Sequence, residues 1–357
     1  KDKIGEGRQS IVYKAITIDD EQVAIKEFKK KTTKNQFDPQ SCWNAEQHNL
    51  KKCQCDFVIQ LLDAINQKGN YWIVMELAEI TLSEELEIGD ITDDFIWKRF
   101  LQILLGLAKV HQQNILHRDL KPENIFIVND VAKLADFGVS KQQSNFTQRT
   151  KTMIGTVCNF SPEKLKCQQY SNKSDVWELG ILLYIMITGE HPFYSKNYDT
   201  VLLNKLILEG KFKEPNCNQE LSQLVHQLLH VNCQERPNVC QIIQLPVVQE
   251  KLKKYNLFYF VEQNPEILTA SNFCEDCEQD RLKIASYIEK INDRITNETL
   301  SYDEVESLMS TLINWETVKS QLQNYYAKKC SIIQMMEQIP KEYQQTVQSM
   351  IQLKKNE

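Results

Sequence analysis

The sequence predicts an α+β fold in which a small strand-rich part is followed by a larger helical part. Residues 1–75 alternate strand-like runs with one helical stretch, Asn44–Cys53. From Phe95 to His111 apolar residues recur every three or four positions, a period typical of a helix that faces a core, and helical patterns dominate again from Asp175. At 357 residues, 42% of them hydrophobic, the chain can bury a large core and hold more than one domain.

One motif carries the chemistry. Residues 117–124 read His-Arg-Asp-Leu-Lys-Pro-Glu-Asn, and Asp136-Phe137-Gly138 follows shortly afterwards. Two acidic groups, a lysine and an amide at this spacing provide what phosphoryl transfer from Mg-ATP needs: a base, a contact for the moving phosphate and oxygen ligands for the metal. The stretch resembles the catalytic core of eukaryotic protein kinases. The resemblance implies a bilobal protein kinase-like fold, with a β-rich N-lobe of about residues 1–77 and a helical C-lobe of about residues 78–253.

The strand-rich part carries further motifs of this family. Ile4–Val12 looks like the glycine-rich loop that joins the first two strands, where residues without a Cβ let backbone N–H groups close over phosphates. Val23-Ala24-Ile25-Lys26 lies in an alternating run typical of a strand, and the resemblance makes Lys26 the cation on the α- and β-phosphates. Glu46, in the predicted helix, is then expected to form an ion pair with Lys26; the alternative is a solvated carboxylate on the helix surface.

In the larger part, the resemblance assigns a role to each polar residue of the catalytic motif. It implies that Asp119 is the catalytic base, that Lys121 steadies the transferred phosphate, and that Asn124 and Asp136 bind Mg²⁺. Later motifs of the family follow at Ser161-Pro162-Glu163, with Ser161 in place of the usual Ala, at Asp175–Gly180 and at Glu235-Arg236-Pro237. By the same resemblance, Glu163 is expected to pair with Arg236 in an architectural role.

The strand Tyr71–Leu77 is expected to lead into the hinge between the lobes. By resemblance Met75 is the gatekeeper behind the adenine, and the backbone of Glu76–Ala78 hydrogen-bonds the base. The expected ATP-binding residues are Ile4, Gly5, Gly7, Val12, Ala24, Lys26, Met75, Glu76 and Ala78.

Two departures from the family pattern qualify this expectation. Ser10 replaces the third glycine of the loop, and its Cβ and hydroxyl predict weaker or altered ATP binding, not its loss. The chain begins a few residues before Gly5 without an initiator Met, so we expect a fragment with a clipped first strand.

The Ser/Thr type of substrate is expected because Lys121 follows Asp119 and because Gly155-Thr156 precedes Ser161. The stretches His117–Phe126, Asp136–Lys141 and His191-Pro192-Phe193 look like those of NIMA-related or of calcium/calmodulin-dependent kinases, and the sequence does not decide between them. The alternative function is a pseudokinase scaffold that acts through its helical tail. Every catalytic position retains the required residue type, which favours the active enzyme.

Regulatory and substrate residues also follow from the resemblance. Thr152, with Thr150 as the second candidate, occupies the place of an activating phosphate, for which Arg118 and Lys141 are the expected cationic partners. Glu123 matches a carboxylate that in relatives faces basic residues upstream of the phosphosite, and Thr156 belongs to the substrate-facing segment. The hypothesis is a preference for Thr in a basic context; the alternative for Glu123 is a solvated loop carboxylate.

Composition excludes several other classes of protein. The net charge of −6 gives no basic patch for nucleic acid, and the longest apolar run, Leu179–Ile187, is too short to span a bilayer. Eleven cysteines without a repeating framework indicate free thiols, and hence an intracellular, cytoplasmic protein. Cys53-Gln54-Cys55 and the single pair Cys274 and Cys277 lack the further ligands of a structural zinc site. The expected ligands are therefore ATP and Mg²⁺, and the expected partners are protein substrates.

Beyond Lys253 the resemblance ends. Ser301-Tyr302-Asp303-Glu304 has the form of a helix capping box, and apolar residues follow it at helix-face spacing. Residues 254–357 are therefore expected to form a helical C-terminal extension that either docks on the large lobe or binds a partner. A structural bundle and a regulatory segment both remain open.

Overall fold

The computed structural model describes residues 2–7, 9–30, 38–136, 158–166, 170–194 and 200–269. They belong to one compact unit, and the chain from residue 275 forms a second. The capping box expected at residues 301–304 lies outside the described residues. In the part that the structure describes, none of the helices combines the length and the apolar character that a membrane span requires.

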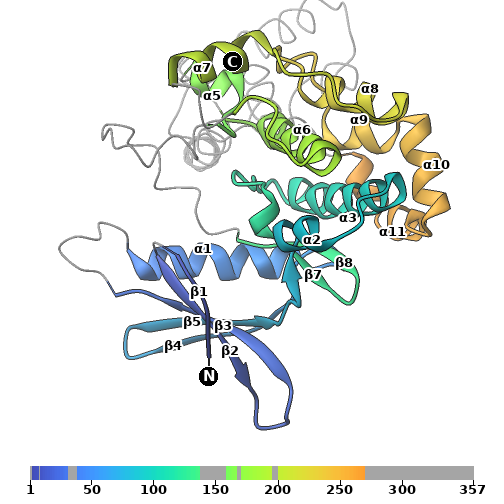
Figure 1. Cartoon of the computed structure of the whole chain (residues 1–357). Coiled ribbons are helices and arrows are strands. Elements are labelled where there is room, and N and C mark those ends of the chain that lie inside the picture. Colours follow the sequence, from blue (N-terminus) through green and yellow to red (C-terminus); the bar gives the residue numbers. More distant parts are fainter. Residues whose placement is uncertain are drawn as a thin grey trace, which may run out of the picture. The chain divides into compact units, whose positions relative to one another are not determined.

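The first part of the chain forms a five-stranded antiparallel sheet with the strand order β1-β2-β3-β5-β4. Its strands are β1 (Asp2–Glu6), β2 (Ser10–Ile16), β3 (Gln22–Phe28), β4 (Leu61–Gln67) and β5 (Asn70–Glu76). Helix α1 (Pro39–Lys52) lies against β4 and β5, across one face of the sheet (Figure 1). The predicted N-lobe, strand-rich with one helix, is confirmed.

The sequence of α1 determines which face it turns to the sheet. The Asp38 carboxylate caps the helix by accepting a hydrogen bond from the Ser41 N–H, and Pro39 at the first helical position needs no hydrogen-bond acceptor. Cys42, Glu46 and Leu50 are spaced four residues apart, so they share one face, and all three are buried. Glu46 is the single charged residue of that buried face. Because Cys42 and Leu50 are buried on either side of it, their packing sets its position.

The larger lobe is built around two long buried helices. Helix α3 (Asp93–Gln112) begins at Thr92, whose hydroxyl accepts from the Phe95 N–H, and α6 (Asn172–Thr188) ends at Gly189 with φ 69°. Both helices are apolar on almost every side and lie in the main hydrophobic core. Gly180 of α6 lets α8 approach closely, because a Cβ there would lie 2.8 Å from the Cβ of Leu228.

Shorter elements complete this lobe. They are β6 (Ile80–Thr81), α2 (Leu82–Ile88), the 3-10 helix η1 (Pro122–Asn124), β7 (Ile125–Val128), β8 (Val131–Leu134), α5 (Pro162–Leu165), α7 (Thr200–Glu209), α8 (Gln219–Leu228), α9 (Val239–Ile243), α10 (Pro246–Lys254), α11 (Phe258–Gln263) and η3 (Pro265–Leu268). Strands β6, β7 and β8 form a second, three-stranded antiparallel sheet beside α3. The α+β, bilobal fold predicted from the sequence is confirmed.

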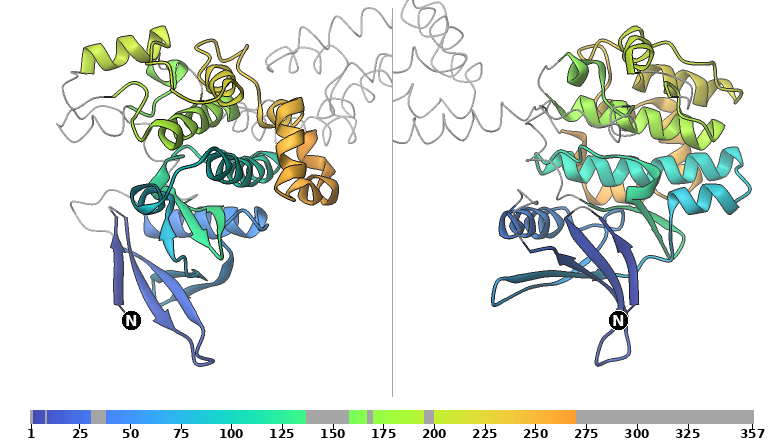
Figure 2. Two further views of the ribbon diagram at one scale, coloured as in Figure 1. Left: turned by 45° about the vertical axis from the view of Figure 1, so that its right-hand side comes forward. Right: turned by 60° about the vertical axis from the view of Figure 1, so that its left-hand side comes forward.

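The residues just after position 253 belong to the same packed unit. α10 and η3 lie against α3, and α11 follows α10 (Figure 2). The ring of Phe260 meets the ring of Phe57 edge-to-face at 4.9 Å, and the Tyr259 hydroxyl donates to Asp56 at 2.8 Å. The domain boundary expected near Lys253 therefore stays a prediction, and residues up to 269 add buried contacts beyond it.

Candidate active site

Two side chains of the catalytic motif, those of Lys121 and Asn124, converge on Asp119. The Lys121 ammonium donates to its Oδ2 atom at 2.7 Å, and the Asn124 amide donates to the same atom at 2.8 Å and to the Asp119 carbonyl oxygen at 2.8 Å. Burial is the largest single influence and acts to lower the pKa of Lys121. The charge and hydrogen bond of Asp119, with the charges of Glu123 and Asp136, together outweigh it, and the net shift is upward. The structure thus brings Asp119, Lys121 and Asn124 together, with a fixed positive charge beside the carboxylate.

Lys26 lies between two carboxylates that come from distant parts of the chain. Its Nζ atom donates to Glu46 Oε1 at 2.5 Å and to Asp136 Oδ1 at 2.7 Å. Burial alone would lower the pKa of Lys26, but Asp136 and Glu46 together raise it above its ordinary value, so the ammonium stays charged. The expected pair of Lys26 with Glu46 is present, which excludes the alternative of a solvated Glu46.

Asp136 connects the residues around Lys26 with those around Asp119. It follows β8 with a left-handed backbone, φ 63°, and the Ala135 N–H donates to the Asn124 carbonyl oxygen at 3.3 Å. The charge of Lys26 lowers the pKa of Asp136, although burial opposes this shift. The two predicted metal ligands therefore come from segments that are hydrogen-bonded to each other, and Asp136 is held as a carboxylate.

The predicted ATP-binding residues lie on facing strands or beside them. β1 and β2 pair Gly5 with Val12, and β3 and β5 pair Ala24 with Met75. Ile4 belongs to β1, and Gly7 directly follows that strand. Glu76 ends β5, and Ala78 lies two residues after it. Val12 of β2 pairs with Lys26 of β3, and Lys26 pairs with Ile73 of β5. The strand pairing therefore places Val12, Ala24 and Met75 on three adjacent strands.

Two positions in this set have specific partners. The Glu76 carboxylate accepts two hydrogen bonds from Lys133 of β8, at 2.8 and 2.9 Å, which ties the end of β5 to the second sheet. The carbonyl oxygen of Ser10, the residue in place of the third glycine, accepts from the Gly7 N–H at 2.9 Å. The serine is compatible with a closed turn, because this contact uses the backbone alone.

Backbone amides of the catalytic loop are held by carboxyl groups of α6, which the sequence analysis did not anticipate. Asp175 accepts from the N–H groups of His117 at 2.9 Å and Arg118 at 2.8 Å, and Glu178 accepts from the Leu120 N–H at 2.9 Å. Arg118 has φ 69°, a conformation rarely adopted by residues other than glycine. The sequence signal is the segment Asp175–Gly180, one of the later motifs of the family.

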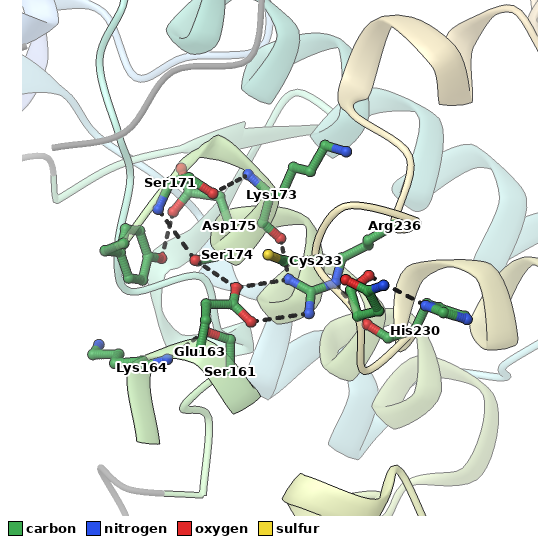
Figure 3. A network of polar contacts seen from close by, with 12 residues as sticks. Ser161, Glu163, Lys164, Ser171, Lys173, Ser174, Asp175, His230, Cys233 and Arg236 are labelled. Atoms are coloured by element: carbon green, nitrogen blue, oxygen red, sulfur yellow. Dashed lines mark hydrogen bonds and ion pairs between the residues drawn. The ribbon is translucent and has the colours of Figure 1, made fainter. Parts of the chain in front are cut away.

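A second buried network holds the end of the segment that follows the catalytic motif (Figure 3). Arg236 donates to both carboxylate oxygens of Glu163, at 2.9 and 3.1 Å, and Ser174 donates to the same carboxylate at 2.7 Å. The guanidinium also lies 5.0 Å from the ring centroid of Trp177. The expected pair of Glu163 and Arg236 is confirmed.

The structure describes only some of the predicted regulatory and substrate residues. Lys141, Thr150, Thr152 and Thr156 lie outside the described residues. Glu123 is exposed on η1, and the backbone of Arg118 is held by Asp175 as described above. The seven described cysteines are free thiols, and the described residues contain no cluster of three His, Cys, Asp or Glu side chains that could hold a metal. Asn124 and Asp136 provide one amide and one carboxylate, which is fewer than such a cluster needs.

Comparison with known proteins agrees with this geometry. The family model described as "Protein kinase domain" matches residues 1–248. The chain is similar to the human "Serine/threonine-protein kinase Nek5", with 33% identity over 58% of this chain and 30% of the relative. It is similar to "Serine/threonine-protein kinase Nek11" of Macaca fascicularis, with 30% identity over 74% of this chain and 41% of the relative. A probable myosin light chain kinase of Dictyostelium discoideum is 31% identical over 70% of this chain and 65% of the relative.

The chain spans less than half the length of these two Nek relatives. The sequence left two resemblances open, to NIMA-related and to calcium/calmodulin-dependent kinases. These Nek relatives support the first of them. A family match over more than two thirds of the chain, together with the contacts of Lys26, Glu46, Asp119 and Asp136, establishes that this protein belongs to the protein kinase family.

Proposed function

We propose that the protein is a Mg-ATP-dependent protein kinase that phosphorylates serine and threonine side chains of proteins. The observation that carries the proposal is the placement of Lys26 between Glu46 and Asp136, at 2.5 and 2.7 Å. This arrangement joins the strand-rich lobe to the catalytic segment, and a family member needs it for nucleotide placement. The Nek relatives bear the printed description of serine/threonine kinases, which supports the substrate type.

The donor set fits Mg-ATP. Mg²⁺ prefers oxygen ligands and usually takes one or two from protein side chains, with phosphates and water completing its shell. Asn124 and Asp136 supply an amide and a carboxylate, and the lowered pKa keeps Asp136 ionised. Lys26 supplies the cation for phosphate oxygens, and the glycines at positions 5 and 7 leave room for a phosphate beside the backbone. When bound, Mg-ATP supplies the phosphoryl group that is transferred.

The protein's own side chains perform the remaining tasks. The Asp119 carboxylate accepts the proton of the attacking hydroxyl group, as general-base catalysis requires. Lys121, which is 2.7 Å from Asp119 and stays protonated, balances negative charge beside it. Asn124 holds the Asp119 carboxylate in one orientation through its amide. The pseudokinase alternative has no support from these contacts, because each catalytic position retains the residue type that its proposed role needs.

The test is transfer of radiolabel from ATP to a generic protein substrate. The wild type is compared with Asp136→Asn, and Asp63→Asn, an exposed position on β4, is the matched control. We expect phosphoserine or phosphothreonine in the product of the wild type and of the control, and a strong loss for Asp136→Asn. A folded wild type that binds Mg-ATP and transfers no label contradicts the proposal.

For substrate choice we propose a preference for threonine in a basic context. Support for the basic context comes from Glu123, which is exposed on η1 one residue before Asn124, where its carboxylate is available to a basic side chain of a substrate. The threonine preference follows from the resemblance alone, through the β-branched Val139. A positional-scanning peptide array tests this preference with the wild type and Glu123→Gln. Loss of basic selectivity in the variant is expected; an acidic or proline-directed preference of the wild type, or a clear bias for serine, is the contrary result.

A further inference from the structure

The catalytic loop and the first half of α6 meet through backbone amides. Asp175 accepts from the N–H groups of His117 and Arg118, and Glu178 accepts from the N–H group of Leu120 through Oε2 at 2.9 Å. Asp119, the catalytic base of the proposed function, lies between these anchored amides. Asp175 and Glu178 are three residues apart on α6, so their side chains leave the same face of the helix.

Glu178 occupies an unusual environment for an acidic residue. It is 2% exposed, and Asp175 of the same face is fully buried. A charged carboxylate in such a place is unfavourable unless strong partners compensate for the lost water. Asp175 has several: besides the two amides it accepts from the Tyr170 hydroxyl at 2.6 Å and lies 2.8 Å from His111 Nε2.

The groups that face Glu178 are mostly neutral or negative. They are Lys164 of α5, the Tyr170 hydroxyl, Asp175 of α6, and the Leu120 amide and Asp119 of the catalytic loop. Burial raises the pKa of Glu178 to about 8, against the attraction of Lys164 and with a further contribution from Asp175. The carboxyl group is therefore uncharged at neutral pH, and it ionises above about pH 8, where it adds a negative charge beside Asp175 and Asp119.

We propose that Glu178 is a positioning residue for the catalytic base: its carboxyl group holds the Leu120 amide and thereby fixes the orientation of Asp119 in the loop. The inference rests on the proposed kinase function. The contact of Glu178 with the Leu120 N–H complements that of Asp175 with the Arg118 N–H, so the residue before Asp119 and the residue after it are both tied to α6. Ionisation of Glu178 adds a negative charge beside Asp175 and Asp119, which makes this support sensitive to alkaline pH.

The first experiment uses Glu178→Gln in the full chain. Glutamine keeps an oxygen acceptor for the Leu120 N–H but does not ionise. We expect kcat at pH 7 within about threefold of the wild type, because the hydrogen bond is retained. The alkaline decline of kcat should lie near pH 8 in the wild type and move upward by about one unit or more in the variant. Identical alkaline declines in both proteins overturn the pH-sensitive part of the proposal.

The second experiment removes the acceptor with Glu178→Ala. Misplacement of a catalytic group lowers the rate by about 10- to 100-fold, so kcat should fall by that factor while KM for ATP stays within about twofold. The matched control is Glu85→Ala, which removes a half-buried carboxylate from the buried Arg99 without touching the catalytic loop. A folded Glu178→Ala variant with wild-type kcat overturns the proposal, as does a Glu85→Ala variant that loses kcat equally.

Hydrogen exchange measured by mass spectrometry separates this inference from the proposed function, because it needs no catalysis. The peptide that contains Leu120 should exchange about tenfold faster in Glu178→Ala and remain protected in Glu178→Gln and Glu85→Ala. If the wild type transfers no phosphate but this pattern appears, the kinase function fails and the structural role of Glu178 stands. Equal protection of the loop in all four proteins overturns the role of Glu178. Where Glu178→Ala does not fold, the Gln variant decides through its pH profile.

Discussion

Arg236 donates to both carboxylate oxygens of Glu163 across 73 positions of sequence, at 2.9 and 3.1 Å. Arg236 is fully buried and Glu163 is 4% exposed, so neither charge has access to solvent. Glu163 belongs to the motif Ser161-Pro162-Glu163, and Arg236 belongs to the motif Glu235-Arg236-Pro237. The pair therefore connects α5 to the segment before α9, and it depends on both partners.

Arg236→Met is expected to lower the free energy of unfolding by about 3–5 kcal/mol, because it leaves Glu163 buried without its partner. Urea unfolding followed by tryptophan fluorescence measures this, since Trp177 lies against the guanidinium. The control is Lys251→Met, whose partner Glu220 is half-exposed; its expected change is at most about 1 kcal/mol. A loss for Arg236→Met that is no larger than the control's would contradict the buried-pair argument.

The same pair predicts a dependence on acidic pH. Burial acts to raise the pKa of Glu163, but Arg236 and Ser174 hold it below its ordinary value of 4.5. A lowered folded-state pKa means that the stabilisation is present above the unfolded-state value and is lost as the pH falls through the folded-state value. The difference in unfolding free energy between wild type and Arg236→Met should therefore shrink from pH 7 to below about pH 4. A difference that stays constant or grows as the pH falls would count against this assignment.

Lys26→Met should abolish most of the activity without unfolding the protein. The substitution removes the cation shared by Glu46 and Asp136, and a fall in kcat/KM of at least about 100-fold is expected from lost electrostatic placement of phosphates. Lys51→Met, at an exposed position of α1, is the control. The assignment of Lys26 is wrong if the variant folds and retains near-wild-type transfer.

Regulation by phosphate at Thr152 remains a prediction from the resemblance. A phosphate is the bidentate, charge-assisted partner that a guanidinium such as that of Arg118 prefers. Phosphatase treatment and Thr152→Ala should each lower activity by about tenfold or more, and Thr150→Ala tests the second candidate site in the same assay. Full activity after both treatments, with no phosphate found between residues 136 and 163 by mass spectrometry, would show that no such switch exists.

The sequence predicted those parts of the site in which residues of the required chemical type lie at the spacing of one short motif. Asp119, Lys121 and Asn124 lie within six residues, so their convergence follows from one short motif. The pair of Lys26 and Glu46 could be expected because the resemblance supplied the partner. Alternation and helical periodicity predicted the strand-rich and helical parts, because one face of each element must be buried.

The remaining contacts could not be predicted for a physical reason. Periodicity shows that a face is apolar or that a residue is buried, but it does not show which distant segment covers it. The bond from Leu120 to Glu178 joins two motifs 58 residues apart, and nothing in a glutamate's residue type indicates that it accepts a backbone amide. The packing of Phe260 on Phe57 spans a still longer separation and involves no motif at all.

That last contact leads to a prediction about the end of the packed domain. The family model ends at residue 248, yet residues beyond Lys253 bury Leu257, Phe260, Val261 and Ile267 against the larger lobe. Burial of one such side chain contributes about 1.5–3 kcal/mol as an upper estimate. A protein that ends at Lys253 should therefore be less stable by several kcal/mol than one that ends at Thr269.

Thermal and urea unfolding of the two truncated proteins measure the difference, and two substitutions in the full chain locate it. Phe260→Ala should lower the free energy of unfolding by about 3–5 kcal/mol, because it opens a cavity beside Phe57. Tyr259→Phe removes one partly exposed hydrogen bond to Asp56 and should change the free energy of unfolding by no more than about 1 kcal/mol. Equal unfolding midpoints for the two truncated proteins would show that the packed domain ends near Lys253, as the sequence predicted.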